Sequence, residues 1–290
     1  MTRPEADTLE PGGGDPSQLA AGSGCFQIPI LMAERRDALR VWYHRPAGFG
    51  AASPILFVLH GVHRNAREYR DTWIEHGDAQ GALIVAPEFS TALFPGARAY
   101  NLGNLSTQGD AAEPAAPSSF SLIERVFEAL RRRTGSEQEA YQVFGHSAGA
   151  QFAHRLVMFE SAARIETALA ANAGWYTLPD PEVAFPYGLG GLSYSDAQLK
   201  RALGTDMIVL AGEDDTLEDD PFLRRSRQAM RQGKNRFERA RYFYEAARRM
   251  AERLETPFAW RFVTVPGIGH DDTAVAAPAA RLLFGKAKLT

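Results

Sequence analysis

Short, unbroken runs of apolar residues recur along the chain, each closed by glycine, proline or a charged residue. Such runs are typical of strands in a parallel sheet covered on both faces, because both sides of each strand are then buried. Two earlier β-prone runs, "FQIPILM" and "ALRVWYHRP", are separated only by "AERRDA" and predict an antiparallel pair at the N-terminal edge. The unbroken runs lie at 54–61, 81–89, 140–145, 167–174, 206–213 and 260–267.

Between these runs, apolar residues recur at spacings of three and four, which predicts amphipathic helices. Strand and helix therefore alternate, and this alternation is typical of right-handed βαβ units. The fold class that follows is α/β, with a doubly wound, mostly parallel sheet and helices on both faces. The expected helices span about 66–80, 119–134, 149–163, 221–254 and 272–284.

The length of the chain favours one large domain. With 290 residues, 45% of them hydrophobic, the chain can bury a single core, and we expect one domain over residues 25–290. The first 24 residues are rich in Pro, Gly and acidic residues and are expected to form a disordered tail. Two long segments without a regular period, 90–118 and 175–203, follow predicted strands. Open α/β sheets bind ligands at this edge, so we expect both loops to be functional.

Composition argues against several classes of partner. The net charge of −3 gives no overall attraction to nucleic acid or anionic membrane, and no apolar run of about 18 residues would span a bilayer. The sequence begins without a basic stretch followed by an apolar one, so no secretion signal is expected and we expect a cytoplasmic protein. Cys25 is the single cysteine, which excludes an intramolecular disulfide and a Cys-rich metal site. No cofactor is expected.

The stretch "GHSAG" at 145–149 fits the pattern Gly-x-Ser-x-Gly between an apolar strand and a predicted helix. Glycines at both ends permit a turn so sharp that larger side chains would collide, and the turn projects the serine hydroxyl above the sheet edge. This context predicts that Ser147 is a nucleophile. Its alternative role is structural, as the N-cap of the helix that follows.

A serine nucleophile needs a base to take its proton, and the base needs a carboxylate to orient it. "VTVPGIGHDD" places His270 just after the last predicted strand, and "DMIVLAGEDDT" places Asp214 and Asp215 just after the strand before it. The chain order Ser, Asp, His is the one this architecture imposes, since all three must emerge at the same edge of the sheet. The residues alone leave both aspartates open, and either is also an ordinary turn former.

These segments together make the sequence resemble an α/β-hydrolase, with "GHSAG" as nucleophile elbow, "GEDDT" as acid turn and "GIGHD" as histidine loop. The resemblance covers about residues 26–286. In that family the acid commonly stands three positions after the glycine that closes its strand, which selects Asp215 and leaves Asp214 as the alternative. The resemblance thus implies a catalytic triad of Ser147, Asp215 and His270.

The negative charge that develops on a substrate carbonyl oxygen needs hydrogen-bond donors. The backbone N–H of Ala148, directly after the nucleophile, is expected to supply one. The family has a His-Gly-x turn matched here by "HGV", which assigns the second donor to the Val62 N–H, with His63 as the alternative. "HGVH" also suggests a histidine pair for a metal, but it lacks acidic or cysteine companions and its glycine favours a turn, so no metal is expected.

Within the family, "HGVHRNAREYRDTW" and "NAGWY" are most similar to polyhydroxyalkanoate-depolymerase-like esterases, which implies a small-molecule or oligomeric ester as substrate. Side chains on the long loops and turns are candidates for its binding site, and packing beneath the loops is an equally open role for the aromatic ones. His146, inside the elbow, is expected to pack beneath the sheet edge. The candidates are His63, Tyr100, Asn101, His146, Trp175 and Tyr176, with Phe94 and Tyr187 beside them.

Residues 224–254, "RRSRQAMRQGKNRFERARYFYEAARRMAERL", are strongly basic. Their apolar positions recur every three or four residues, so we expect one helix face to pack on the sheet and the arginines to reach solvent on the other. A role in guiding an anionic polymer stays open, and hydrolysis of a poly(amino acid) would fit it.

The function predicted from these observations is that of a serine hydrolase that cleaves a carboxylic ester through an acyl-enzyme. Two alternatives stay open: an amidase, peptidase or poly(amino acid) hydrolase on the same triad, and a non-catalytic binding protein that keeps the fold. The presence of all three triad residue types in order favours catalysis. No nucleic acid or membrane partner is expected, and the sequence does not determine the oligomeric state.

Overall fold

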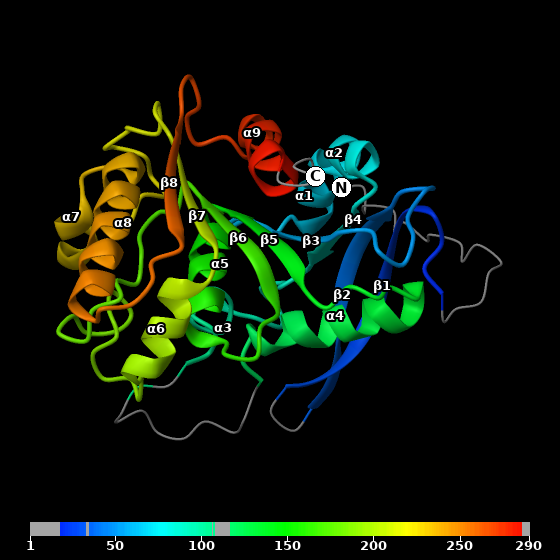
Figure 1. Ribbon diagram of the computed structural model, residues 1–290, viewed down its shortest axis with the longest axis horizontal. Helices are drawn as coiled ribbons and strands as arrows, with labels where there is room; N and C mark the ends of the chain where they lie inside the picture. Colours follow the sequence, from blue (N-terminus) through cyan, green and yellow to red (C-terminus); the bar gives the residue numbers. More distant parts are fainter. Residues whose placement is uncertain (1–17, 33–34, 106, 108–116, 286–290) are drawn as a thin grey trace, which may run out of the picture.

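An eight-stranded sheet forms the centre of the computed structural model, which describes residues 18–32, 35–105, 107 and 117–285 (Figure 1). The strands are β1 (Gly22–Met32), β2 (Arg35–Arg45), β3 (Ile55–Leu59), β4 (Leu83–Pro87), β5 (Tyr141–His146), β6 (Ile165–Ala171), β7 (Met207–Gly212) and β8 (Trp260–Val265). They lie in the order β1-β2-β4-β3-β5-β6-β7-β8. β2 pairs antiparallel with both β1 and β4, whereas the pairs from β4 to β8 are parallel.

The sheet confirms the fold class expected from the sequence. Each predicted strand is present, and the antiparallel pair lies at the N-terminal edge. β1 begins at Gly22, so the last residues of the expected tail belong to the sheet, while residues 1–17 lie outside the described part of the chain. The unbroken apolar runs predicted the strands well, because a strand that is buried on both faces has no polar residues alternating with its apolar ones.

Alternate side chains of each central strand enter two separate cores. In β3, Ile55 and Phe57 pack into one core, while Leu56 and Val58 pack into the other. All five residues of β3 are buried. This two-sided burial is the reason that the sheet needs helices on both faces.

Two groups of helices cover the sheet (Figure 1). One core contains side chains of α1 and α9, with α2 packed beside them, and the other contains side chains of α4, α5, α6 and α8. The helices are α1 (Ala66–Thr72), α2 (Ile74–Gln80), α3 (Gly96–Ala99), α4 (Ser121–Thr134), α5 (Ala148–Phe159), α6 (Asp196–Gly204), α7 (Arg227–Gln232), α8 (Arg236–Arg253) and α9 (Asp272–Phe284). Among the described residues, none of the helices combines the length and apolar character needed to cross a bilayer.

Two of the expected helices are each broken into two. The predicted helix at 66–80 is interrupted at Trp73, whose buried ring packs 4.7 Å from that of Phe144. The predicted helix at 221–254 starts only at α7 and stops again at Gly233, which has φ 150°. Asn235 then caps α8 by accepting the N–H of Glu238 at 2.9 Å. Periodicity alone did not reveal these breaks, because apolar positions keep the same spacing on both sides of them.

The two segments expected to be long loops contain short helices. α3 lies in the first segment, of which residues 106 and 108–116 are outside the described part of the chain. α6 closes the second segment, and Ser195 and Gln198 form a capping box at its start. Ser-x-x-Gln is a helix-start signal that the sequence contains, so the span 175–203 was too long as a loop prediction.

Candidate active site

Ser147 stands at the junction of β5 and α5 with φ 56° and ψ −114°. A positive φ is costly for a residue with a side chain and persists only where the surroundings enforce it. A Cβ on Gly145 would lie 2.1 Å from the carbonyl oxygen of Gly149, and one on Gly149 would lie 2.0 Å from that of Leu59. Only glycine therefore fits on either side of the turn. The Ser147 side chain does not cap α5, so the structure does not give it the N-cap role.

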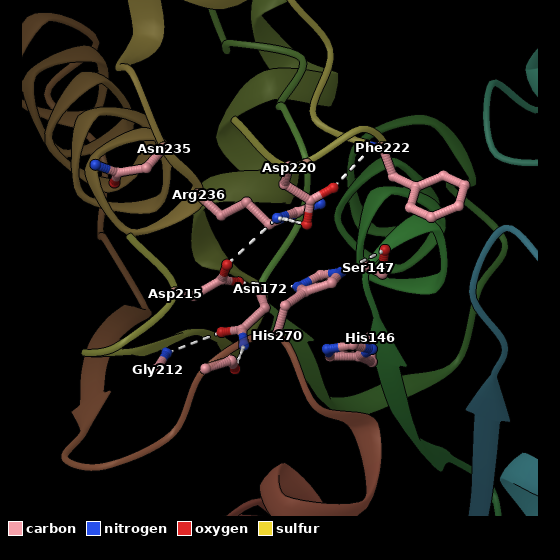
Figure 2. A network of polar contacts seen from close by, with 12 residues as sticks. His146, Ser147, Asn172, Gly212, Asp215, Asp220, Phe222, Asn235, Arg236 and His270 are labelled. Atoms are coloured by element: carbon pink, nitrogen blue, oxygen red, sulfur yellow. Dashed lines mark hydrogen bonds and ion pairs between the residues drawn. The ribbon is translucent and has the colours of Figure 1, made fainter. Parts of the chain in front are cut away.

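Three side chains from separate strand ends meet at the carboxyl edge of the sheet (Figure 2). Nδ1 of His270 lies 2.9 Å from Oδ2 of Asp215, and Nε2 lies 3.1 Å from Oγ of Ser147. Because a carboxylate only accepts hydrogen bonds, Nδ1 carries the proton and Nε2 accepts the serine hydroxyl. The Asp215 side chain is 3% exposed, while that of His270 is 22% exposed. The histidine is therefore accessible and its carboxylate partner is enclosed.

The neighbouring carboxylate takes a different position. Asp214 is exposed, and its backbone N–H donates to the carbonyl of Ile268 at 3.0 Å. The turn at the end of β7 thus directs Asp215, and not Asp214, to the histidine. This is the choice that the resemblance implied and that the residues alone left open.

Asn172 ties the end of β7 to the histidine loop. Its side chain accepts the N–H of Gly212 at 2.8 Å and donates to the carbonyl of Gly269 at 2.8 Å. Asn172 has φ 53°, a conformation that asparagine tolerates better than most residues. It holds the backbone directly before His270 in place. The sequence analysis missed this role, since nothing local to "ANAG" indicates contacts with the end of β7 and with the histidine loop.

A buried arginine lies behind the carboxylate that contacts the histidine. Nη1 of Arg236 lies 3.4 Å from Oδ1 of Asp215 and 2.9 Å from Oδ2 of Asp220 (Figure 2). The Arg236 side chain is 2% exposed, that of Asp215 is 3% exposed and that of Asp220 is 14% exposed. Burial acts to raise the pKa of Asp220, but the hydrogen bonds from Arg236 and from the Phe222 N–H outweigh it and the net shift is downward. The arginine thus compensates one buried carboxylate, that of Asp215, and one partly buried carboxylate, that of Asp220.

The sequence analysis expected the arginines of the basic segment to reach solvent, and for two of them this expectation was wrong. Arg236 and Arg239 are both buried. Arg239 donates to the carbonyl oxygens of Gly174 at 2.6 Å and Gly233 at 2.9 Å. Both stand in the first turn of α8, which follows the cap residue Asn235. This position brings Arg236 to Asp215, after β7, and Arg239 to Gly174, after β6. Arginines farther along α8, such as Arg241, are exposed as expected.

The two expected oxyanion donors lie on either side of Ser147. Ala148 is the first residue of α5, where the leading N–H groups have no partner within the helix. A Cβ on Gly61 would lie 3.9 Å from Cβ of Ser147, so the turn that carries Val62 is next to the serine. Within residues 18–32, 35–105, 107 and 117–285, the N–H groups of Ala148 and Val62 have no acceptor. Both are available to an incoming oxygen atom.

His146 is buried beneath the site, as the sequence analysis expected. Its Nδ1 lies 3.2 Å from the Tyr69 hydroxyl, and its ring centroid lies 4.6 Å from that of His270. Burial and the neighbouring His270 lower the pKa of His146 well below its usual range. A neutral ring there supports His270 by packing, so His146 is not positioned to touch a substrate.

Two more buried histidines are fixed as neutral rings by backbone groups. Nε2 of His60 accepts the Phe89 N–H at 3.2 Å, and Nε2 of His154 accepts the Thr177 N–H at 3.1 Å. A proton on either nitrogen would face another N–H group. Burial lowers the pKa of His60 to about 4 and that of His154 well below its usual range. Backbone groups occupy both ring nitrogens of His60, so His60 is not placed as half of a metal-binding pair.

Acid should therefore destabilise the fold at unusually mild pH. Between pH 6.5 and 4 the unfolded chain binds a proton at His60 that the folded chain excludes, so the free energy of unfolding falls as the pH falls. His60 alone accounts for about 3 kcal/mol at pH 4, and His146 and His154 act in the same direction. Urea unfolding at pH 7.5, 6.0 and 5.0 measures this loss. A free energy of unfolding that stays constant from pH 7.5 to 5.0 would rule it out.

The side chains expected to wall a substrate pocket are mostly in the core. Tyr100, Asn101 and Tyr176 are 1%, 6% and 0% exposed. Tyr100 donates its hydroxyl to the His60 carbonyl, and Tyr176 stacks on Phe243 of α8 at 4.4 Å. Of the two roles left open, packing beneath the loops is the one these three residues have. The sequence does not distinguish them because both roles require aromatic residues after strand ends.

The remaining pocket candidates also differ from one another. Trp175 is 4% exposed and is flanked by the guanidinium groups of Arg155, at 4.3 Å, and Arg224, at 5.3 Å. Phe94 and Tyr187 are buried as well. His63 alone among the candidates is exposed. Its ring lies 5.5 Å from that of Phe222 in an edge-to-face arrangement.

Comparison with known proteins places this geometry in a family. No family model matches the chain, and no curated protein matches it. Poly(aspartic acid) hydrolase-1 from Sphingomonas sp. KT-1 is 38% identical, with a TM-score of 0.86 over 92% of this chain and 100% of that one. LpqC, a poly(3-hydroxybutyrate) depolymerase from Bordetella parapertussis, is also 38% identical, with a TM-score of 0.84 over 91% of this chain and 89% of that one.

More distant structures share the fold alone. An S-formylglutathione hydrolase from Agrobacterium tumefaciens is 13% identical, with a TM-score of 0.59 over 91% of this chain and 95% of that one. The two structures at 38% identity extend over nearly the whole of both chains, which is well beyond a likeness of fold. From its sequence and its structure alike, this chain belongs to the α/β-hydrolase superfamily, in the branch of polyhydroxyalkanoate-depolymerase-like esterases, and is an enzyme of the hydrolase class.

Proposed function

We propose that the protein is a serine hydrolase that cleaves a carboxylic ester through an acyl-enzyme on Ser147. The observation that carries the proposal is the hydrogen-bonded series from Asp215 to His270 to Ser147, with separations of 2.9 and 3.1 Å. A serine hydroxyl is a weak nucleophile unless a base removes its proton. Nε2 of His270 is within hydrogen-bonding reach of that proton, and its accessible edge faces the substrate side.

The reaction has two halves that use the same groups. As Oγ of Ser147 bonds to the carbonyl carbon, Nε2 of His270 takes the hydroxyl proton, and Asp215 stabilises the imidazolium. The proton then passes to the alcohol oxygen as the ester bond breaks, leaving the acyl group on Ser147. A water molecule attacks this acyl-enzyme, gives its proton to Nε2, and releases the carboxylic acid and free serine.

The N–H groups of Ala148 and Val62 are proposed to hold the carbonyl oxygen in both halves. The negative charge on that oxygen is greatest in the tetrahedral intermediate, so donors aimed at it accelerate the reaction. The absence of any protein acceptor for these two groups within the described residues supports the assignment. Holding them needs a fixed turn after β3, which packing of Gly61 against Ser147 provides.

Hydrolysis of poly(aspartic acid) is a second candidate, favoured by the 38% identity of this chain to a hydrolase of that polymer. The hydrolase of that polymer from Sphingomonas sp. KT-1 and the depolymerase LpqC are equally identical to this chain, so identity does not choose between amide and ester. The charge on the acid turn and on the residues after it favours the ester. Exposed Arg224 and Arg225 follow this segment directly, but residues 213–223 themselves carry exposed carboxylates on Glu213, Asp214, Glu218 and Asp219 and no lysine or arginine. Such charges oppose binding of a polyanion.

A matched pair of substrates separates the two candidates. p-Nitrophenyl butyrate and butyryl p-nitroanilide carry the same acyl group on oxygen or nitrogen, and oligo(3-hydroxybutyrate) and poly(aspartic acid) repeat the comparison with polymers. We expect turnover of both esters and little release of amine from the anilide or from poly(aspartic acid). Protein inactivated beforehand by a fluorophosphonate is the control. Release of amine from poly(aspartic acid) without ester turnover would favour the second candidate instead.

A further inference from the structure

Phe222 is an exposed aromatic side chain in the segment that follows the acid turn. It is 64% exposed. Its ring lies 5.5 Å from that of His63, edge to face, and Val62, the neighbour of His63, is 50% exposed. Single exposed apolar side chains are common, but exposed apolar residues gathered at one place mark a binding surface.

This surface adjoins the nucleophile. Val62 and His63 continue the turn from Gly61, whose Cβ position lies 3.9 Å from Cβ of Ser147. Figure 2 shows the Phe222 ring on the Ser147 side of the polar network, away from Asp215. A substrate with its carbonyl carbon at Ser147 and its oxygen at the Val62 N–H would therefore extend a substituent along Val62 toward Phe222.

The backbone at Phe222 is held rigidly. The Phe222 N–H donates to Oδ1 of Asp220 at 2.7 Å, while Oδ2 of Asp220 accepts from Arg236 at 2.9 Å. The next residue, Leu223, is buried and donates its N–H to the Asp220 carbonyl at 3.0 Å. Arg236 also contacts Asp215. The Arg236 guanidinium thus helps to hold the backbone that carries Phe222, and a held backbone lowers the entropic cost of binding a ligand against the ring.

We infer that Phe222, with Val62 and His63, forms an apolar subsite beside Ser147 that binds an aliphatic substituent of the ester. The inference rests on the proposed function and adds a class of substrate to it. Phe222 and Val62 present apolar side chains and His63 contributes the face or edge of its ring, so the surface favours a longer aliphatic substituent over a shorter one. Each methylene that it buries raises kcat/KM by up to about fourfold.

A chain-length series tests the subsite. p-Nitrophenyl acetate, butyrate and hexanoate are compared for wild type, Phe222→Ala and Phe222→Leu. For wild type, kcat/KM should rise with acyl length. Phe222→Ala should lose about tenfold or more on the hexanoate and about threefold or less on the acetate, which flattens the series, whereas Phe222→Leu keeps most of the rise.

Leu217→Ala is the matched control, because Leu217 lies in the same segment and is 62% exposed but carries no aromatic ring. It should leave the series unchanged. An equal loss on all three esters for Phe222→Ala, or a series as steep as that of wild type, would overturn the subsite. Fluorophosphonate labelling keeps this failure apart from a failure of the proposed function. If the chain-length test fails while wild-type protein labels and turns over esters, only the subsite is wrong. If folded wild type neither labels nor turns over esters, both proposals are wrong.

Discussion

Ser147→Ala should lower kcat on p-nitrophenyl butyrate by about 10⁴- to 10⁶-fold and leave the fold intact. The substitution removes only Oγ, which lies 3.1 Å from Nε2 of His270. Gly145 and Gly149 permit the close turn between β5 and α5, and alanine differs from serine only in lacking Oγ, so we expect it to take the same backbone conformation. Initial rates at saturating ester measure the loss.

The control for this variant is Ser195→Ala, which removes a serine hydroxyl that caps α6. It should keep wild-type kcat, with a loss of about 1 kcal/mol in the free energy of unfolding. Circular dichroism and urea unfolding of Ser147→Ala should match wild type. A Ser147→Ala protein that retained a tenth of the wild-type kcat would show that Ser147 is not the nucleophile.

Asp215→Asn should lower kcat by about 10⁴-fold, the second largest effect expected. An asparagine cannot neutralise the imidazolium that forms on His270, and its amide group can donate to Nδ1 and so favour the wrong tautomer. The variant also removes one of two carboxylates from Arg236, so the free energy of unfolding should fall. Activity is therefore measured at a temperature where circular dichroism shows the variant to be folded.

Asp214→Asn is the matched control, because it makes the same change one residue earlier. Asp214 is exposed, so its substitution should change kcat by about threefold at most and leave stability close to wild type. The comparison discriminates sharply between the two carboxylates. A large loss for Asp214→Asn with activity retained in Asp215→Asn would reverse the assignment and contradict the geometry.

The fold was largely predictable from the sequence because strands that are buried on both faces consist of unbroken apolar runs. The breaks within helices were not predictable in the same way. Trp73 interrupts a helix through packing against Phe144, a contact between residues far apart in the chain. Gly233 and Asn235 interrupt another through backbone conformation and capping, signals that the strong periodicity on either side concealed.

The meeting of Ser147, Asp215 and His270 was predictable, because each of them follows a strand of the sheet. Ser147 follows β5, Asp215 follows β7 and His270 follows β8, and the topology brings the carboxyl ends of these parallel strands to one edge of the sheet. Their supporting residues were not predictable. Asn172 acts through two backbone groups on other segments, and Arg236 is a buried cation in a segment whose composition indicates solvent.

The surroundings of the candidate substrate-binding residues were the hardest to predict, and most of these residues are buried. Aromatic residues after strand ends serve equally as pocket walls and as core, and only the packing of α8 onto Tyr176 decides between these roles. Phe222, which we propose to contact the substrate, could not be singled out from the sequence, because a single phenylalanine in an acidic segment has no local signature. Its position depends on Asp220 and Arg236, which meet only in the folded protein.

The most direct test of the account is to locate the adduct of a fluorophosphonate. The probe bonds to an activated serine oxygen with loss of fluoride, and trypsin then releases residues 134–155 as one peptide that contains both Ser147 and Ser136. The account predicts one phosphonyl group per chain, located on Ser147 by fragmentation, with no adduct in Ser147→Ala. Folded protein without an adduct, or an adduct on Ser136 or another residue, would contradict it.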